Sequence, residues 1–157
     1  MTDLLIELKT RARLRLNAAR GQQPDLRLRE CLNQVATEVG FTNWSHGRRV
    51  LGGEAQRGED MGRFWHAPGC NALLNAWFAD YFDACSALAL KKGAVLLPYR
   101  RQFVLAGAPF IRELGLDHRD ADWAVARHDL VQAYGTDPWF RLAFQRLRAP
   151  KSTFGRR

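Results

Sequence analysis

The sequence has little cysteine and no long apolar run. Its three cysteines are an odd number without the spacing of zinc ligands, which predicts small buried thiols rather than a metal site. No window contains 18 consecutive apolar residues, so we expect no membrane-spanning helix and no membrane partner. The N-terminal segment MTDLLIELKTRAR lacks the apolar core of a secretory signal. We therefore expect a soluble, cytoplasmic protein.

The motifs of common enzyme classes are also missing. The sequence contains no phosphate-binding loop, no dinucleotide-binding glycine pattern, no G-x-S-x-G and no H-E-x-x-H. Its four histidines are scattered, and the aspartates in 117–122 lack the glycine and the distal glutamate of a calcium-binding EF-hand. We therefore expect no catalytic residues, no metal and no cofactor.

Positive charge is abundant but unevenly distributed. The chain has 24 Lys and Arg, most of them Arg, against 16 Asp and Glu, for a net charge of +8. Residues 1–50 contain nine basic and five acidic side chains, residues 51–97 four and five, and residues 98–157 eleven and six. Arg suits phosphate contacts, although an Arg-rich composition also follows from a GC-rich genome. Two basic ends around a near-neutral middle favour an anionic partner.

Helical periodicity predicts a mostly α fold around one long central helix at 71–92. Large apolar residues in this stretch recur at spacings of three and four, and Lys91, Lys92 and Gly93 form a typical helix end. Because the apolar face is wide, we expect this helix to be buried on most sides, with the rest of the chain packed around it.

Other segments divide the chain into an N-terminal unit and a core unit. Helices at 3–20, 26–39 and 43–51 form a three-helix unit within 1–53, and the polar loop 54–61 is the best boundary. Further helices at 109–116, 121–130 and 138–148 belong to a core unit, 60–149, packed with the first as one globule. Residues 150–157 form a short basic tail, which we expect to be mobile.

The segment 94–106 has two open interpretations. It is rich in Val, Leu, Tyr and Phe, contains Pro98, and is framed by Gly93 and Gly107. It forms either a pair of short strands or an extended lead into a helix, because proline restricts a strand to an edge or a bend. The fold therefore contains at most a minor β element near 95–105.

One segment, Leu32 to Leu51, resembles a helix-turn-helix of the AraC type. Ala36 is small where two helices must cross closely, Gly40 lies at the turn, and Val35, Val39 and Phe41 are the expected buried positions. Gly47 stands where that family usually places an aromatic core residue. The chain as a whole looks like bacterial proteins of unknown function. The resemblance implies that exposed residues of the second helix enter the major groove of DNA.

The candidate nucleic-acid-binding residues come from three places. The second helix of the motif supplies one set, the basic first helix another, and a pair of arginines beside Tyr99 and Phe103 a third, since arginines among aromatic rings suit a nucleic-acid strand. These residues are Asn43, Ser45, His46, Arg48 and Arg49, then Arg11 and Arg15, then Arg100 and Arg101.

Three functions from different classes remain open. The first is a small basic nucleic-acid-associated protein, with DNA as the favoured partner and gene regulation as one role it could serve. The second is a non-catalytic protein-interaction module or subunit, a homodimer included, in which the surplus of aromatic residues forms an exposed apolar patch. The third is an enzyme acting on a small anionic substrate, which requires a pocket that holds Arg together with His or Asp.

Overall fold

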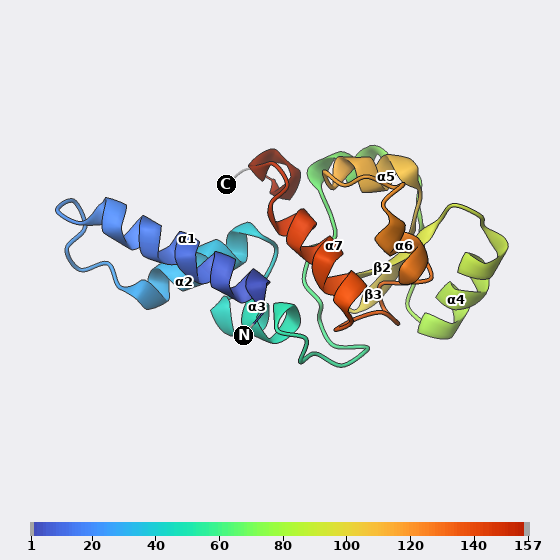
Figure 1. Ribbon diagram of the computed structural model, residues 1–157, viewed down its shortest axis with the longest axis horizontal. Helices are drawn as coiled ribbons and strands as arrows, with labels where there is room; N and C mark the ends of the chain where they lie inside the picture. Colours follow the sequence, from blue (N-terminus) through green and yellow to red (C-terminus); the bar gives the residue numbers. More distant parts are fainter. Residues whose placement is uncertain (1, 156–157) are drawn as a thin grey trace.

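The computed structural model describes residues 2–155, which form an elongated molecule with two differently built ends (Figure 1). One end consists of α1 (Asp3–Ala19), α2 (Leu28–Glu38) and α3 (Trp44–Leu51). The other end holds a small sheet and most of the remaining helices, and α7 (Asp137–Leu147) lies between the two ends. The expectation of a mostly α fold is confirmed.

The three N-terminal helices begin and pack as their sequences suggest. Thr2 caps α1 by accepting a hydrogen bond from the Leu5 backbone N–H, and Asn43 caps α3 in the same way. Leu8 and Ala12 bury the apolar stripe of α1. Cys31 of α2 is fully buried, as expected for a small apolar side chain.

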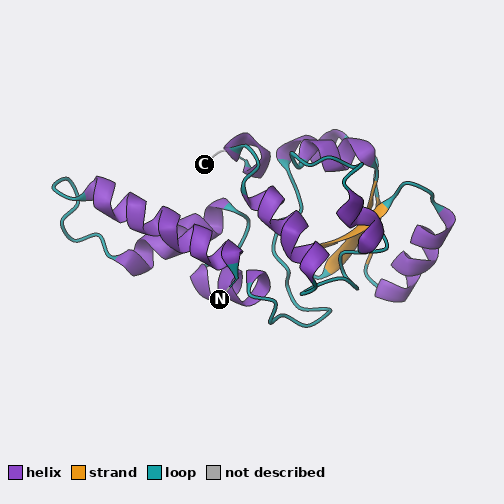
Figure 2. Cartoon of the chain, viewed as in Figure 1, coloured by secondary structure: helices purple, strands orange, loops and turns teal. Residues whose placement is uncertain are grey.

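The segment 94–106 forms strands rather than a lead into a helix. β2 (Val95–Tyr99) and β3 (Gln102–Ala106) make an antiparallel hairpin, and β1 (Ala76–Phe78) joins the other side of β3, for a strand order of β1-β3-β2 (Figure 2). Pro98 fits because β2 lies at the edge of this sheet. The hairpin matches the expected minor β element, whereas β1 was not expected.

Both faces of the β2–β3 hairpin are buried, and side chains that alternate along β3 pack into two different clusters. Val104 and Ala106 face the main core, and Phe103 and Leu105 face a second, smaller cluster. The smaller cluster is closed by α4 (Tyr81–Leu90). The main core is continuous from α1 to α7 and includes the segment 61–70 and α5 (Ala108–Glu113).

The prediction of one central helix at 71–92 is wrong. The stretch divides into η1 (Pro68–Ala72), then β1, then α4, which begins after Asp80. The Asp80 side chain accepts a hydrogen bond from the Asp83 N–H, so this aspartate caps the start of α4 and does not lie within a longer helix. Leu74 is fully exposed and Trp77 is 42% exposed, which contradicts the expected burial. Strand pairing with β3 outweighs the helical spacing here.

The predicted helix at 121–130 is also shorter than expected. α6 (Ala121–Val125) ends early because Arg127 and His128 take left-handed backbone angles, with φ of 57° and 60°. The following residues run beside the free edge of β2, where the Leu96 N–H donates to the His128 carbonyl at 2.8 Å.

The tail contributes to the core through η2 (Lys151–Phe154). The Arg146 side chain of α7 is fully buried and donates to five oxygens at 2.6–3.1 Å. The acceptors are the carbonyls of Phe64, His66, Leu114 and Thr153 and the Thr153 hydroxyl. We call this arrangement the carbonyl cage. The tail was expected to be mobile, but residues 151–154 close this cage; residues 156 and 157 lie outside the described residues.

Burial is the main cause that lowers the pKa of Arg146, to about 9. No carboxylate of the described residues pairs with it, and the ring of Phe154 lies 3.7 Å from its guanidinium carbon. Because all of its hydrogen-bond donors are directed at protein oxygens, this arginine holds the fold together and is closed to a ligand.

No helix within residues 2–155 is both long enough and apolar enough to cross a membrane.

Candidate nucleic-acid interface

A large groove lies between the N-terminal helices and the rest of the molecule, with a volume of about 1410 Å³. One wall comes from α1 and the end of α2, and the opposite wall from the residues that follow α7. The segment 60–71 and the tip of the β2–β3 hairpin complete the lining. Its charged residues are Arg11, Arg15, Arg63, Arg100, Arg148, Lys151, Glu38 and Asp60, with His46 and His66. Positive side chains therefore outnumber carboxylates by four.

Two close backbone contacts place Arg63 in this groove. Gly40, at φ +102°, accepts a hydrogen bond from the Arg63 N–H at 2.8 Å. A Cβ atom at Gly40 would lie only 2.7 Å from the Arg63 carbonyl carbon, so no other residue fits without a shift. Gly40 was identified as the turn of the helix-turn-helix-like segment, and it also sets the position of a groove arginine.

The arginines of α1 that were candidates for phosphate contact already have partners. Arg11 donates to the Glu7 carboxylate at 3.1 Å and to the Leu147 carbonyl at 3.0 Å. Arg15 donates to Glu38 at 2.8 Å, and this hydrogen bond is the main cause of a raised Arg15 pKa. Both residues connect α1 to other helices, so their first role is structural, although they still line the groove.

Four groove cations lack such partners. Within the described part of the chain, the side chains of Arg63, Arg100, Arg148 and Lys151 form no hydrogen bond or ion pair, and all four are exposed. Of these, only Arg100 was predicted as a binding residue. The others were missed because they are separated in sequence by up to 88 positions, and no local pattern relates them. The excess of basic residues after position 98 was the available signal.

Aromatic rings lie at the hairpin end of the groove. The His66 and Tyr99 ring centroids are 5.1 Å apart, and Trp77 packs edge-on against Tyr99 at 5.2 Å. Arg100 lies at the left-handed tip of the hairpin, with φ 52°, and its guanidinium carbon is 5.7 Å from the Tyr99 ring. Burial, and then the charges of Arg63 and Arg146, lower the pKa of His66, so we expect a neutral imidazole at pH 7. Phe103, expected beside Arg100, is instead buried.

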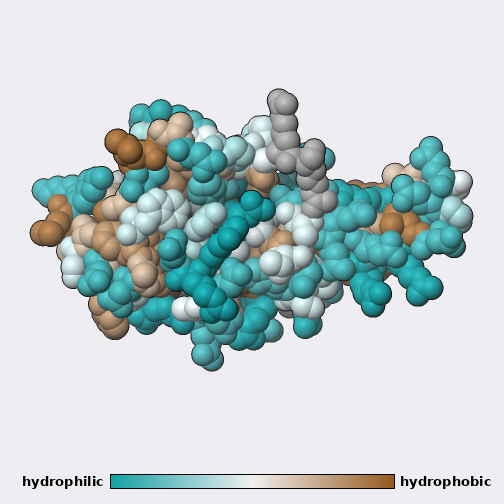
Figure 3. Space-filling model, turned by 180° about the vertical axis from the view of Figure 1, so that it is seen from behind, coloured by the Kyte–Doolittle hydropathy of each residue, from teal (hydrophilic) through white to brown (hydrophobic). Residues whose placement is uncertain are grey.

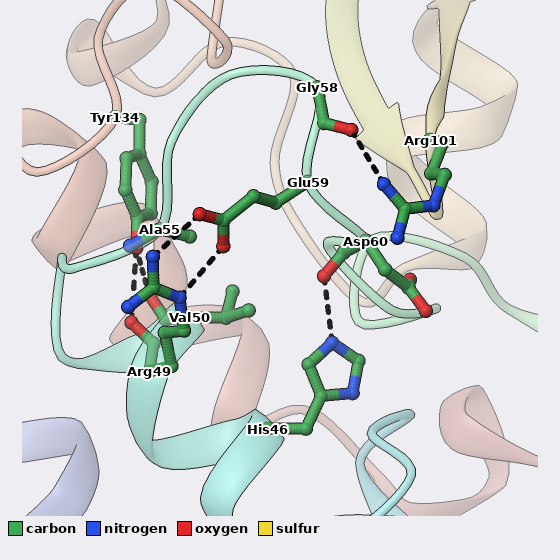
Figure 4. A network of polar contacts seen from close by, with 9 residues as sticks. All are labelled: His46, Arg49, Val50, Ala55, Gly58, Glu59, Asp60, Arg101 and Tyr134. Carbon is green, nitrogen blue, oxygen red and sulfur yellow. Dashed lines mark hydrogen bonds and ion pairs between the residues drawn. The ribbon is translucent and has the colours of Figure 1, made fainter.

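The exposed face of α3 lies against the loop 54–61 (Figure 4). Arg49 forms a two-pronged ion pair with Glu59, with N–O distances of 2.7 and 2.5 Å, and this pairing lowers the pKa of Glu59. His46 accepts from the Thr42 N–H at 3.1 Å and donates from Nε2 to the Asp60 carbonyl at 2.7 Å. We call residues 54–61 the acidic loop.

The α3 candidates therefore divide into engaged and open side chains. His46 and Arg49 contact the acidic loop, and Asn43 caps the helix with a 2.9 Å hydrogen bond. Ser45 and Arg48 are exposed, and Arg48 has no side-chain partner among the residues described. Arg101, at the hairpin tip, donates to the Gly58 carbonyl of the acidic loop at 3.2 Å.

Gly47 explains how α3 packs without the aromatic residue that the AraC type usually has there. A Cβ atom at this position would lie 3.2 Å from the Phe41 ring and 3.4 Å from the Ala36 Cβ. Phe41 therefore fills the space from the turn, and its ring stacks on Phe64 at 5.8 Å. The helix pair is close-packed by a different choice of residues.

A buried pair of ionisable side chains, Tyr81 and Asp129, lies outside the groove. The Tyr81 hydroxyl donates to buried Asp129 at 2.6 Å, and the other Asp129 oxygen accepts the Val131 and Gln132 N–H groups. Burial and this carboxylate raise the pKa of Tyr81. The pair stabilises the turn beside β2, a structural role. No group of three or more metal-ligating His, Cys, Asp or Glu side chains occurs within residues 2–155.

A separate apolar surface lies at the α4 end of the molecule. Leu74, Phe82 and Leu90 are 103%, 71% and 89% exposed. Seen from behind in Figure 3, brown patches lie at the left end, the end that holds α4, while teal covers much of the middle. None of these three side chains lines the basic groove, whereas another exposed apolar residue, Leu14, does.

Comparison of the chain with known protein families, with curated proteins and with solved structures found no match.

Proposed function

We propose that this protein binds nucleic acid through the groove between its N-terminal helices and the residues that follow α7. The observation that supports this most directly is a set of four exposed groove cations whose side chains form no hydrogen bond or ion pair with any residue from 2 to 155: Arg63, Arg100, Arg148 and Lys151. Cations held in a concave surface concentrate anionic ligands, and phosphate contacts supply most of non-specific nucleic-acid affinity.

The groove accounts for binding better than α3 alone. Reading of DNA bases requires an exposed recognition helix, but two of the five candidates on α3 contact the acidic loop and a third caps the helix. Ser45 and Arg48 remain open. In this proposal α3 adds contacts at the rim of the site, and a regulatory DNA-binding role depends on displacement of the acidic loop.

The experiment is fluorescence anisotropy of labelled oligonucleotides, single-stranded and duplex, across a salt series. The test variant is Arg63→Glu/Arg148→Glu, and the matched control is Arg112→Glu/Arg119→Glu. The control changes the net charge equally, at two exposed arginines outside the groove.

We expect the groove variant to lose more than about tenfold in affinity at low salt and to lower the salt slope by about two. The control should change affinity by a few-fold at most, through the general field. Equal losses in the two variants, or no binding by the unaltered protein at about 50 mM salt, would contradict the proposal.

A second candidate, a protein-interaction module, is favoured by one observation. Leu74, Phe82 and Leu90 expose apolar surface of the kind that partners cover. Sedimentation of the protein at increasing concentration, with a Phe82→Ser/Leu90→Ser variant, tests a homodimer. Association that is insensitive to salt and lost in the variant would support it.

A further inference from the structure

An aromatic side chain whose exposure the fold does not explain lies next to the hairpin end of the groove, against the groove residues Tyr99 and His66. Trp77 is 42% exposed, and among the described residues it belongs to neither buried cluster. The other four tryptophans are buried or half-buried. Exposing an indole forgoes much of its hydrophobic contribution to stability, so the position calls for another explanation.

The ring of Trp77 is nevertheless held in place. Its backbone pairs with Val104 in the sheet. Its ring centroid lies 5.2 Å from that of Tyr99 and 6.5 Å from that of His66. These three rings come from β1, β2 and the segment before η1, which are fixed independently. A rigid, partly exposed aromatic surface needs little ordering when a ligand stacks on it.

Positive charge adjoins this surface. Tyr99 and His66 line the groove together with Arg63 and Arg100, which have no side-chain partners among residues 2–155. Aromatic rings beside a cationic groove are the features by which proteins bind single strands, with bases stacked on the rings and phosphates at the cations. The bases of a duplex are stacked on one another, so their faces are not available to such a surface.

Within the proposed nucleic-acid function, on which this inference rests, we propose that the protein prefers single-stranded nucleic acid and that the exposed ring of Trp77, held edge-on by Tyr99, stacks against one of its bases. The groove cations hold the adjoining phosphates. A duplex binds through phosphate contacts alone and more weakly.

The test uses Trp77→Ala, with Phe82→Ala as the matched control. Phe82 is an aromatic residue on α4 that is 71% exposed. Its ring packs on Tyr81, which does not line the groove, whereas the Trp77 ring packs on Tyr99, which does. Trp77→Phe retains a stacking ring and separates loss of stacking from loss of folding. The probes are labelled oligothymidylate of about 15 nucleotides, an abasic strand of the same length, and a duplex of that length.

Stacking contributes about 1–3 kcal/mol per base, so we expect Trp77→Ala to weaken oligothymidylate binding by roughly 5- to 150-fold. Affinity for the abasic strand and the duplex should stay within about twofold, since those probes use phosphate contacts. Trp77→Phe should restore most of the loss, and Phe82→Ala should have no effect.

Four results would overturn the inference, and the first two leave the proposed function intact. If Trp77→Ala binds oligothymidylate as the unaltered protein does, or if the abasic strand binds equally well, the groove binds phosphate without stacking and the proposed function stands. If Phe82→Ala weakens binding as much as Trp77→Ala, the ligand lies on the α4 surface. If no probe binds, both proposals fail.

Discussion

The carbonyl cage and the groove contain the same kind of side chain in opposite circumstances. Arg146 is fully buried and its donors meet five protein oxygens. Arg148, two residues later, is exposed, and its guanidinium carbon lies 5.5 Å from the centroid of the Phe144 ring. Its side chain forms no hydrogen bond or ion pair within residues 2–155. The two regions adjoin, since His66 supplies a carbonyl to the cage and its ring to the groove. Arginine content alone therefore does not indicate a binding surface. Arginines that stabilise the fold, such as Arg146, must first be distinguished from exposed arginines such as Arg148.

The largest effect is expected in the cage. Arg146→Met leaves four buried or half-buried carbonyls without their donor, and we expect a loss of about 3–5 kcal/mol in the free energy of unfolding. Urea denaturation measures it. Arg148→Met is the matched control and should change stability by no more than about 0.5 kcal/mol. A small effect of Arg146→Met would mean that the cage relaxes and water replaces the arginine.

Arg148→Met, which should leave stability nearly unchanged, is expected to weaken nucleic-acid binding. Arg148→Met should weaken nucleic-acid binding by about threefold to tenfold and lower the salt slope by about one. Anisotropy at several salt concentrations measures both quantities. If the slope of affinity against salt concentration is unchanged, Arg148 makes no phosphate contact. The cage and the groove would then differ in burial but not in binding.

A moderate effect is expected at the acidic loop. Glu59→Gln removes the carboxylate that pairs with Arg49 and frees this arginine beside α3. We expect binding to tighten by about twofold to threefold, because surface ion pairs are weak and easily exchanged for phosphate contacts. Glu54→Gln, an exposed change in the same loop, removes the same charge without releasing Arg49. Equal gains in the two variants would show a general charge effect.

The smallest effect concerns His66 and pH. Its pKa is lowered in the folded protein, mainly by burial, so below the ordinary value of 6.5 the unfolded chain binds a proton first. Stability should therefore fall as the pH drops through 6.5, then level off below the folded pKa. His66→Gln should flatten this dependence between about pH 7 and 5, measured by urea denaturation. Stability that rises on acidification would show that His66 gains a partner for its charge.

Local signals in the sequence predicted several elements closely. The helices at 3–20, 43–51 and 138–148 begin and end within about a residue of α1, α3 and α7, because capping residues and proline mark their first turns. The hairpin was one of two open interpretations, and Pro98 correctly indicated an edge strand.

The failures have a common physical origin in long-range pairing. Residues 76–78 have helical spacing but join the free edge of β3, about 27 positions away along the chain, and no local pattern shows that such an edge is available. Asp80 could have indicated that a helix starts within this stretch, because aspartate favours the start of a helix over its middle.

The candidate site was predicted only in part for the same reason. Arg100 was found through its aromatic neighbour, but Arg63 and Arg148 meet in the groove only after folding. Arg49 is exposed on α3 as predicted, whereas His46 is half-buried with its ring against Phe41. Their contacts with Glu59 and Asp60 depend on how the acidic loop folds back. Sequence periodicity predicts which residues share a face of a helix, but it does not predict which segment packs against that face.

The contact between Arg11 and the Leu147 carbonyl closes a loop of 136 positions between the two walls of the groove. By the usual logarithmic rule, such a closure costs about 4 kcal/mol of chain entropy, and contacts this distant in sequence slow folding. We therefore expect this contact to contribute to slow folding. If nucleic acid binds in the groove as we propose, it joins both ends of the chain, so by linkage it should stabilise the whole fold against unfolding and not only the surface it touches.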